Sequence, residues 1–122
     1  MKKSNSTDRQ CLKRILRYIG DIQQIFEDAD IKEFQDLKKS LMAKYATTQV
    51  LTNIYELSRK LQDTTLGGLT KFNSPILRTA RQIASHNYEA IDFKSIYSLC
   101  MTLTGDTVRN ELEAFLEVLK DD

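Results

Sequence analysis

The chain has 122 residues, a length that fits one domain able to bury a core without disulfides or a structural metal. Its 41% hydrophobic and 29% charged residues are the balance of a globular protein and exclude a disordered one. Four glycines and one proline are too few for the many turns of a β-sandwich, so the composition favours an all-α fold.

The sequence carries no sign of a membrane or secretory segment. No apolar run approaches the length of a membrane span, and the basic N-terminal residues are not followed by the apolar stretch of a signal peptide. Cys11 and Cys100 lie far apart, outside any Cys-x-x-Cys motif, and one histidine is too few for a multi-histidine metal site. We therefore expect a cytoplasmic protein with free thiols, no metal and no cofactor.

The charge is nearly balanced overall but uneven along the chain. Eighteen Lys and Arg residues against 17 Asp and Glu residues give a net charge of +1. Residues 1–20 carry six basic side chains and one acid, whereas residues 106–122 carry two basic side chains and six acids. Two interpretations stay open: a polyanion binds one local basic surface, or the basic first helix simply packs against the acidic last helix.

Apolar residues at steps of three and four predict helices almost throughout the chain. We expect a first helix over residues 8–27. A second, long helix is expected over residues 31–62, either kinked or in contact with different neighbours along its length. The segment 63–73 is expected to form a loop, because Gly67 and Gly68 are the strongest loop signal in the sequence.

Three further amphipathic segments complete the predicted architecture. A third helix is expected from Pro75, a good first helical residue, to about residue 88. A fourth begins after Asp92 as N-cap and ends at Gly105, and a fifth begins at Asp106. The sequence therefore predicts a single all-α domain spanning residues 1–122, an up-and-down bundle of four to five helices.

The predicted third helix carries residue types suited to phosphate chemistry. Arg81 offers a planar fork of donors that matches a phosphate, and His86, the only histidine, can exchange protons near neutral pH. Ser85 and Tyr88 follow Arg81 by four and seven residues, on the same helix face. These groups can cleave RNA without a metal: a base takes the proton of the ribose 2′-hydroxyl, which attacks the adjacent phosphate while Arg stabilises the developing charge.

One histidine per chain is short of the usual acid–base pair. A symmetric homodimer would complete the pair by bringing two copies of His86 together across its axis. A plainer interpretation also stays open, because a histidine near a helix end is commonly a cap or a surface residue. In that interpretation Arg81 only bonds the preceding turns or an acid such as Asp92.

The run Arg81-Gln-Ile-Ala-Ser-His86-Asn87-Tyr88 has the pattern Arg-x4-His-x-Tyr. Together with its place near the end of a helix and the segment Glu89-Ala-Ile-Asp92 that follows, it resembles the signature of the HEPN superfamily, in particular the HepT-like toxins. The resemblance covers most of the chain. It implies a small helical bundle that acts as a homodimeric, metal-independent ribonuclease, with both motifs at the dimer interface, encoded with a minimal nucleotidyltransferase antitoxin.

Carried over residue by residue, the resemblance implies that Arg81 binds phosphate and that His86 is the acid–base group. Tyr88 would be the hydroxyl to which the antitoxin transfers AMP, which adds bulk and negative charge beside the phosphate site, or a contact to the substrate. Gln82, Ser85 and Asn87 would support these residues. Further cations are candidates for contacts to the RNA backbone: Lys71, Arg78, Lys13, Arg14 and Arg17.

The chain also departs from the family's pattern. Gln82 stands where Asn commonly follows the motif Arg, and the Pro-rich run before the motif is reduced to Phe72-Asn-Ser-Pro75. The predicted second helix lacks the usual Gly-containing stretch. The alternative function is a non-catalytic helical binding subunit of a nucleotidyltransferase complex, a role that near-neutral charge and polar helix faces also fit.

Overall fold

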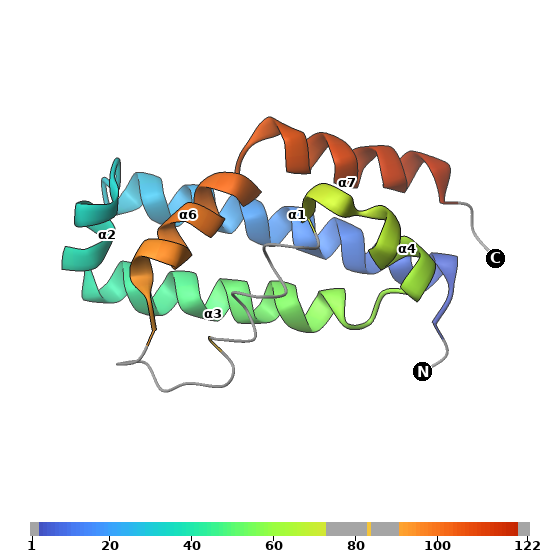
Figure 1. The fold of residues 1–122 in the computed structure, drawn as a ribbon, viewed down its shortest axis with the longest axis horizontal. Coiled ribbons are helices and arrows are strands. Elements are labelled where there is room, and N and C mark those ends of the chain that lie inside the picture. Colours follow the sequence, from blue (N-terminus) through green and yellow to red (C-terminus); the bar gives the residue numbers. More distant parts are fainter. Residues whose placement is uncertain (1–2, 73–82, 84–90, 120–122) are drawn as a thin grey trace.

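The computed structural model describes residues 3–72, residue 83 and residues 91–119 (Figure 1). Within these residues the chain forms helices and no strand, so the expected all-α fold is confirmed. Residues 70–72 and residue 83 are also helical. The other described helices, in chain order, are α1 (Asn5–Asp28), α2 (Phe34–Lys39), α3 (Leu41–Ser58), α4 (Asp63–Gly68), α6 (Phe93–Leu103) and α7 (Asp106–Val118).

The two long helices α1 and α3 lie side by side and antiparallel, along the longest axis of the molecule (Figure 1). Helix α7 packs along α1, and α6 contacts both α2 and α7. The core fills the space between these helices and includes completely buried side chains from each end of the chain: Leu12, Ile22, Leu37, Ile54, Phe72, Leu103 and Leu112. No described helix is long and apolar enough to cross a membrane.

Helix α1 has the apolar face that its sequence predicts. Ile15, Ile19 and Ile22 are buried at spacings of three and four residues. The helix begins three residues earlier than expected because Ser4 and Thr7 form a capping box. The Ser4 Oγ accepts the Thr7 N–H at 3.2 Å, and the Thr7 Oγ1 accepts the Ser4 N–H at 2.9 Å.

The prediction of a single long helix over residues 31–62 is wrong, because the helix is interrupted at Ser40, between α2 and α3. The Ser40 backbone is extended, with φ −98° and ψ 101°, and its Oγ accepts the N–H of Ala43 at 3.1 Å. A serine hydroxyl competes for backbone donors in this way, which makes it a favourable N-cap. The short helix before the break is held by Leu37, which is fully buried.

The loop expected over residues 63–73 is also wrong, because residues 63–68 form α4. Thr65 is buried and donates to the Asp8 carboxylate of α1 at 2.5 Å, so a tertiary contact holds a segment of low helix propensity. Gly68 packs so closely on α7 that a Cβ built there would lie 2.5 Å from the Cζ of Phe115. The absence of a side chain at Gly68 allows this close packing.

The last two described helices begin where the sequence predicts. Asp92 is the N-cap of α6, and its Oδ1 accepts the N–H of Lys94 at 3.0 Å. Its Oδ2 accepts the hydroxyl of Ser95 at 2.8 Å. Hydrogen bonds from the Ser95 side chain, and then from backbone N–H groups, lower the pKa of the Asp92 carboxyl. Helix α7 begins at Asp106.

Candidate functional site

Most of the predicted RNA-cleaving site lies outside the described residues. The structure describes the residues that frame this segment: Lys71 and Phe72 before it, Ile83 within it, and Ile91 and Asp92 after it. The predicted residues that lie outside the described part are Arg78, Arg81, Gln82, Ser85, His86, Asn87 and Tyr88.

The entry to this segment is anchored by Glu111 of α7. The Glu111 carboxylate accepts the backbone N–H groups of Lys71 and Phe72, each at 3.1 Å. The first N–H groups of a helix lack partners within it, so a carboxylate at this position acts as an N-cap supplied by another helix. Phe72 is fully buried, whereas the Lys71 side chain is exposed. Lys71 is thus accessible to a ligand while its backbone is held.

Buried apolar side chains anchor the rest of this frame. Ile83 is buried in the core, and Ile91 packs against the core in a half-buried position. Asp92 follows directly, and both of its carboxylate oxygens accept hydrogen bonds within the first turn of α6. Asp92 therefore has a structural role as a helix cap, independent of the motif.

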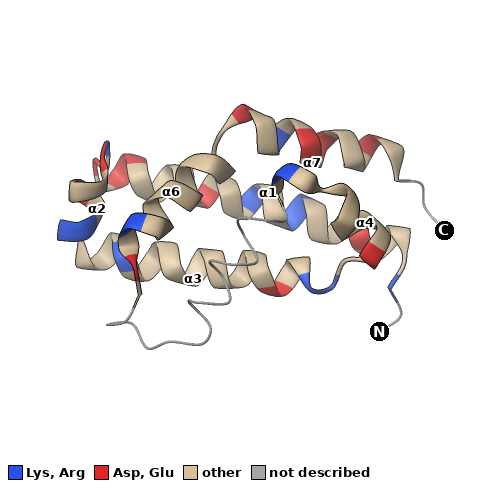
Figure 2. Cartoon of the chain, viewed as in Figure 1, with Lys and Arg blue, Asp and Glu red and all other residues tan. Residues whose placement is uncertain are grey.

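The uneven charge along the chain has a local structural consequence. Helix α1 carries its Lys and Arg residues over residues 9–17 and packs against α7, which carries several acidic side chains (Figure 2). The Arg9 guanidinium donates from Nη1 to the backbone carbonyls of Leu116 and Leu119, at 2.6 and 2.9 Å. A cation at a helix C-terminus satisfies free carbonyls and the negative end of the helix dipole. Contacts to the C-terminal backbone carbonyls of α7 thus account for Arg9.

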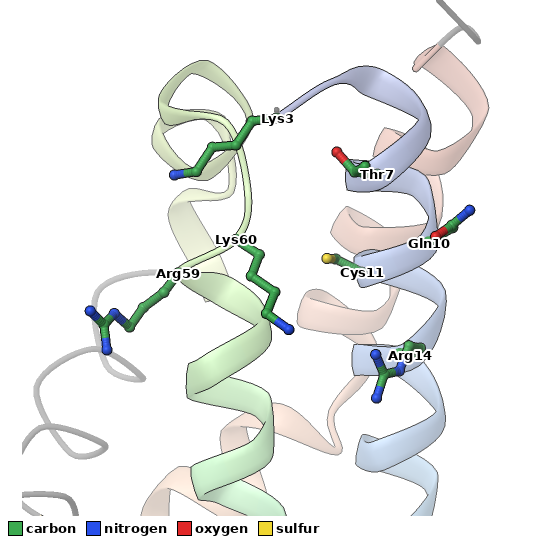
Figure 3. A pocket seen from close by; sticks show the side chains of 7 residues that line it. All are labelled: Lys3, Thr7, Gln10, Cys11, Arg14, Arg59 and Lys60. Atoms are coloured by element: carbon green, nitrogen blue, oxygen red, sulfur yellow. The ribbon is translucent and has the colours of Figure 1, made fainter. Parts of the chain in front are cut away.

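Other cations of α1 point to solvent. Lys13, Arg14 and Arg17 are exposed, as contacts to a polyanion require. Arg14 also lines a pocket between the first half of α1 and the end of α3 (Figure 3). This pocket, named here the basic pocket, has a volume of about 420 Å³ and is lined by Lys3, Thr7, Gln10, Cys11, Arg14, Arg59 and Lys60.

Sequence reasoning named only Arg14 among the cations of the basic pocket. The sequence did not identify Lys3, Arg59 or Lys60 as pocket residues. The adjacent Arg59 and Lys60 were the only signal of a basic site there, and the predicted helix over residues 31–62 enclosed them. In the structure α3 ends at Ser58, so this pair lies at the helix end, beside α1. Folding therefore brings cations from two distant parts of the chain to one pocket.

The two cysteines are free thiols in different surroundings. Cys11 lines the basic pocket, where burial raises its pKa while Lys60 and Arg14 act in the opposite direction. Cys100 is completely buried in the core, and burial raises its pKa to about 12. Among the described residues, no cluster of three or more His, Cys, Asp or Glu side chains forms a metal site.

Comparisons with models of known protein families, with curated proteins and with solved structures found no match.

Proposed function

We propose that this protein is a metal-independent ribonuclease toxin of a toxin–antitoxin pair, with the HEPN-like helical bundle that the motif resembles. The observation that carries the proposal is the pattern Arg81-x4-His86-x-Tyr88 in a chain whose described secondary-structure elements are all helices. The Glu111 carboxylate ties Lys71 and Phe72, which lead into the segment that bears the motif, to α7.

The proposed reaction needs one acid–base group from each of two chains. His86 of one protomer takes the proton of a ribose 2′-hydroxyl, and the 2′-oxygen attacks the adjacent phosphorus. The bond from phosphorus to the 5′-oxygen breaks, and the partner's His86 gives a proton to that leaving oxygen. Arg81 stabilises the charge on the phosphorus oxygens. The products are a 2′,3′-cyclic phosphate and a 5′-hydroxyl.

The second copy is proposed to meet the first through the motif segment and α6. Met101 of α6 is 42% exposed and would be covered by such a contact. The Lys44 ammonium lies 5.4 Å from the Phe93 ring centroid, so the start of α3 is beside the start of α6. On the same two turns of α3, Met42 is 82% and Tyr45 is 55% exposed.

The proposed antitoxin is a minimal nucleotidyltransferase that acts in the same cytoplasm. Transfer of AMP to the Tyr88 hydroxyl places a negative charge beside the phosphate site, where it repels the RNA backbone. Replacing Tyr88 by phenylalanine removes the acceptor hydroxyl. The Tyr88→Phe protein should stay toxic in cells that make the antitoxin, whereas the wild type should gain the mass of AMP and lose toxicity.

The central test compares wild type with His86→Ala and Arg81→Ala in inducible expression. Growth arrest, RNA fragments and 2′,3′-cyclic phosphate ends are expected for wild type, and none of these for the two variants. Arg109→Ala, the same change at an exposed arginine of α7, is the matched control and should remain toxic. Equal toxicity of wild type and His86→Ala would refute the proposal. A chain that binds the nucleotidyltransferase and never cleaves RNA is the non-catalytic subunit instead.

A further inference from the structure

The basic pocket is rich in positive charge. Four of its seven lining residues are Lys or Arg, and the described lining includes no carboxylate. In Figure 3 the side chains of Arg14 and Lys60 extend into the space between α1 and α3, beside the Cys11 sulfur. The Lys3 and Arg59 side chains also line the pocket, but in Figure 3 they extend past the end of α3, away from Cys11. An anion that binds between Arg14 and Lys60 would be attracted by both cations.

The carboxylates nearby offset only part of this charge. Within the described part of the chain, no carboxylate forms an ion pair with Lys3, Arg14 or Lys60. Arg59 is 3.8 Å from Glu56, in an exposed pair that contributes little. Asp8 lies one turn before Cys11 and its charge acts on the pocket, although its oxygens accept hydrogen bonds from Gln62 and Thr65 and not from a pocket cation.

The size and shape of the pocket favour a ligand with several phosphates. A volume of about 420 Å³ lies within the range of small-ligand pockets, which begins at about 300 Å³. Thr7, Cys11 and Arg14 lie on one face of α1 and span roughly 10 Å along its axis, from about 1.5 Å per residue. A single phosphate cannot reach across that length. Arginine forks and lysine ammonium groups both bind phosphate oxygens.

We propose that the basic pocket binds consecutive phosphate groups, and that Arg14 and Lys60 are its principal contacts. The source favoured here is a single-stranded RNA, a choice that rests on the proposed ribonuclease function. A nucleoside triphosphate presents the same chemistry on a shorter chain. The pocket is then a place where the RNA backbone is held, separate from the groups that cleave it.

The test uses the full chain with His86→Ala, so that RNA stays intact during the measurement. Binding of a fluorescein-labelled single-stranded RNA is followed by anisotropy, with and without the pair Arg14→Glu and Lys60→Glu. We expect this pair to weaken binding at least about tenfold. The slope of log K against log salt should fall by about 1.4, the value for two lost contacts on a single strand.

The matched control reverses two lysines far from the basic pocket. Lys38 and Lys39 are exposed at the end of α2, at the opposite end of the molecule, and Lys38→Glu with Lys39→Glu changes the net charge equally. The control should change RNA affinity less than about twofold. If the pocket variant and the control variant lose RNA affinity equally, binding follows net charge and the proposal is overturned. Unchanged RNA affinity in the Arg14→Glu and Lys60→Glu variant would also overturn it.

A second arm distinguishes the two sources of phosphate. ATP is titrated against the same His86→Ala protein, with the Arg14→Glu and Lys60→Glu pair as comparison. If the His86→Ala protein binds RNA and the Arg14→Glu and Lys60→Glu pair abolishes that binding, the ligand is an RNA strand. If the His86→Ala protein binds ATP but no RNA, and the pair abolishes ATP binding, the pocket is supported with a nucleotide as its ligand. Binding of neither probe overturns the proposal.

A thiol measurement tests the pocket without any charge reversal, in case those variants do not fold. Cys11 lines the pocket, whereas Cys100 is completely buried and serves as the internal reference. Tripolyphosphate should slow maleimide labelling of Cys11, mapped by mass spectrometry, and leave Cys100 unchanged. Labelling of Cys11 at the same rate with and without tripolyphosphate contradicts the proposal.

These results separate the pocket from the proposed function. If the His86→Ala chain binds RNA through Arg14 and Lys60 while wild type cleaves no RNA, the pocket stands and the ribonuclease proposal fails. If wild type cleaves RNA while Arg14→Glu with Lys60→Glu leaves both RNA affinity and cleavage unchanged, only the pocket proposal fails.

Discussion

Replacing Asp8 by alanine should destabilise the fold far more than replacing an exposed aspartate on the same helix. Asp8 is completely buried near the start of α1, and its carboxylate joins this helix to the start of α4. Its Oδ1 accepts the backbone N–H of Gln62 at 3.1 Å. Its Oδ2 accepts the Gln62 side-chain amide at 2.9 Å and the Thr65 hydroxyl at 2.5 Å.

The expected magnitude follows from these three hydrogen bonds. Bonds to a charged acceptor contribute about 1.5–3 kcal/mol each, and a buried donor left without a partner costs a similar amount. The Gln62 side chain is half-buried, so its amide can bond to water when Asp8 is removed. The two bonds that count are those from the Gln62 backbone N–H and the Thr65 hydroxyl. Asp8→Ala should therefore cost about 3–6 kcal/mol, or a fall in Tm of roughly 10–25 °C for a chain of this length. Asp8→Asn keeps one acceptor oxygen and should cost about 1–2 kcal/mol.

The free energy of unfolding is to be measured by urea titration, followed by far-UV circular dichroism. Asp21→Ala, at an exposed position of α1, is the control and should change the free energy of unfolding by less than about 0.5 kcal/mol. Thr65→Val, alone and with Asp8→Ala, completes a double-mutant cycle whose coupling energy should exceed about 1 kcal/mol. A cost for Asp8→Ala no larger than that of Asp21→Ala, or a coupling energy near zero, would refute this reasoning.

Three further changes test the packing by the same unfolding measurement. Gly68→Ala brings a Cβ within 2.5 Å of the Phe115 ring of α7 and should lower the free energy of unfolding by about 1–3 kcal/mol. Gly67→Ala is the control, because a Cβ there meets nothing within 4 Å, and it should be neutral or stabilising. Equal effects of the two substitutions would contradict the close approach. Glu111→Ala removes the cap before the motif segment and should cost about 1–2 kcal/mol, against little for exposed Glu113→Ala. Thr47→Val removes a buried hydroxyl with no hydrogen-bond partner and should raise stability by about 1 kcal/mol, so a loss would be the contrary result.

The helices that formed as expected have signals contained within their own residues. The apolar face of α1 follows from the spacing of residues such as Ile15 and Ile22, which repeats with the helical period. The start of α6 follows from Asp92, whose side chain bonds N–H groups two and three residues ahead. Such interactions need no distant partner, so the local sequence is enough to predict them.

The breaks that were missed depend on balances between local signals and distant contacts. Ser40 as N-cap competes with continuation of a helix, and the apolar spacing on both sides gives no sign of which prevails. Segment 63–68 reads as a loop from its glycines, but the bond from Thr65 to Asp8, 57 residues away, holds it as α4. The energy of that bond exists only once α1 is in place.

The candidate site divides in the same way. The pattern of Arg81, His86 and Tyr88 is a property of the sequence and needs no coordinates to be seen. The cap that Glu111 supplies to Lys71 spans 40 residues of chain, and no local pattern announces it. The basic pocket likewise joins side chains that the sequence places more than 40 positions apart.

The sequence alone therefore determined the fold class, the apolar faces of its helices and the residue types of the proposed chemistry, because each depends on neighbours a few positions away. Tertiary structure decided where the second predicted helix breaks, that α4 forms, and that Lys60 lies beside Arg14. These features depend on contacts between residues far apart in the chain, whose free energy appears only when folding brings them together.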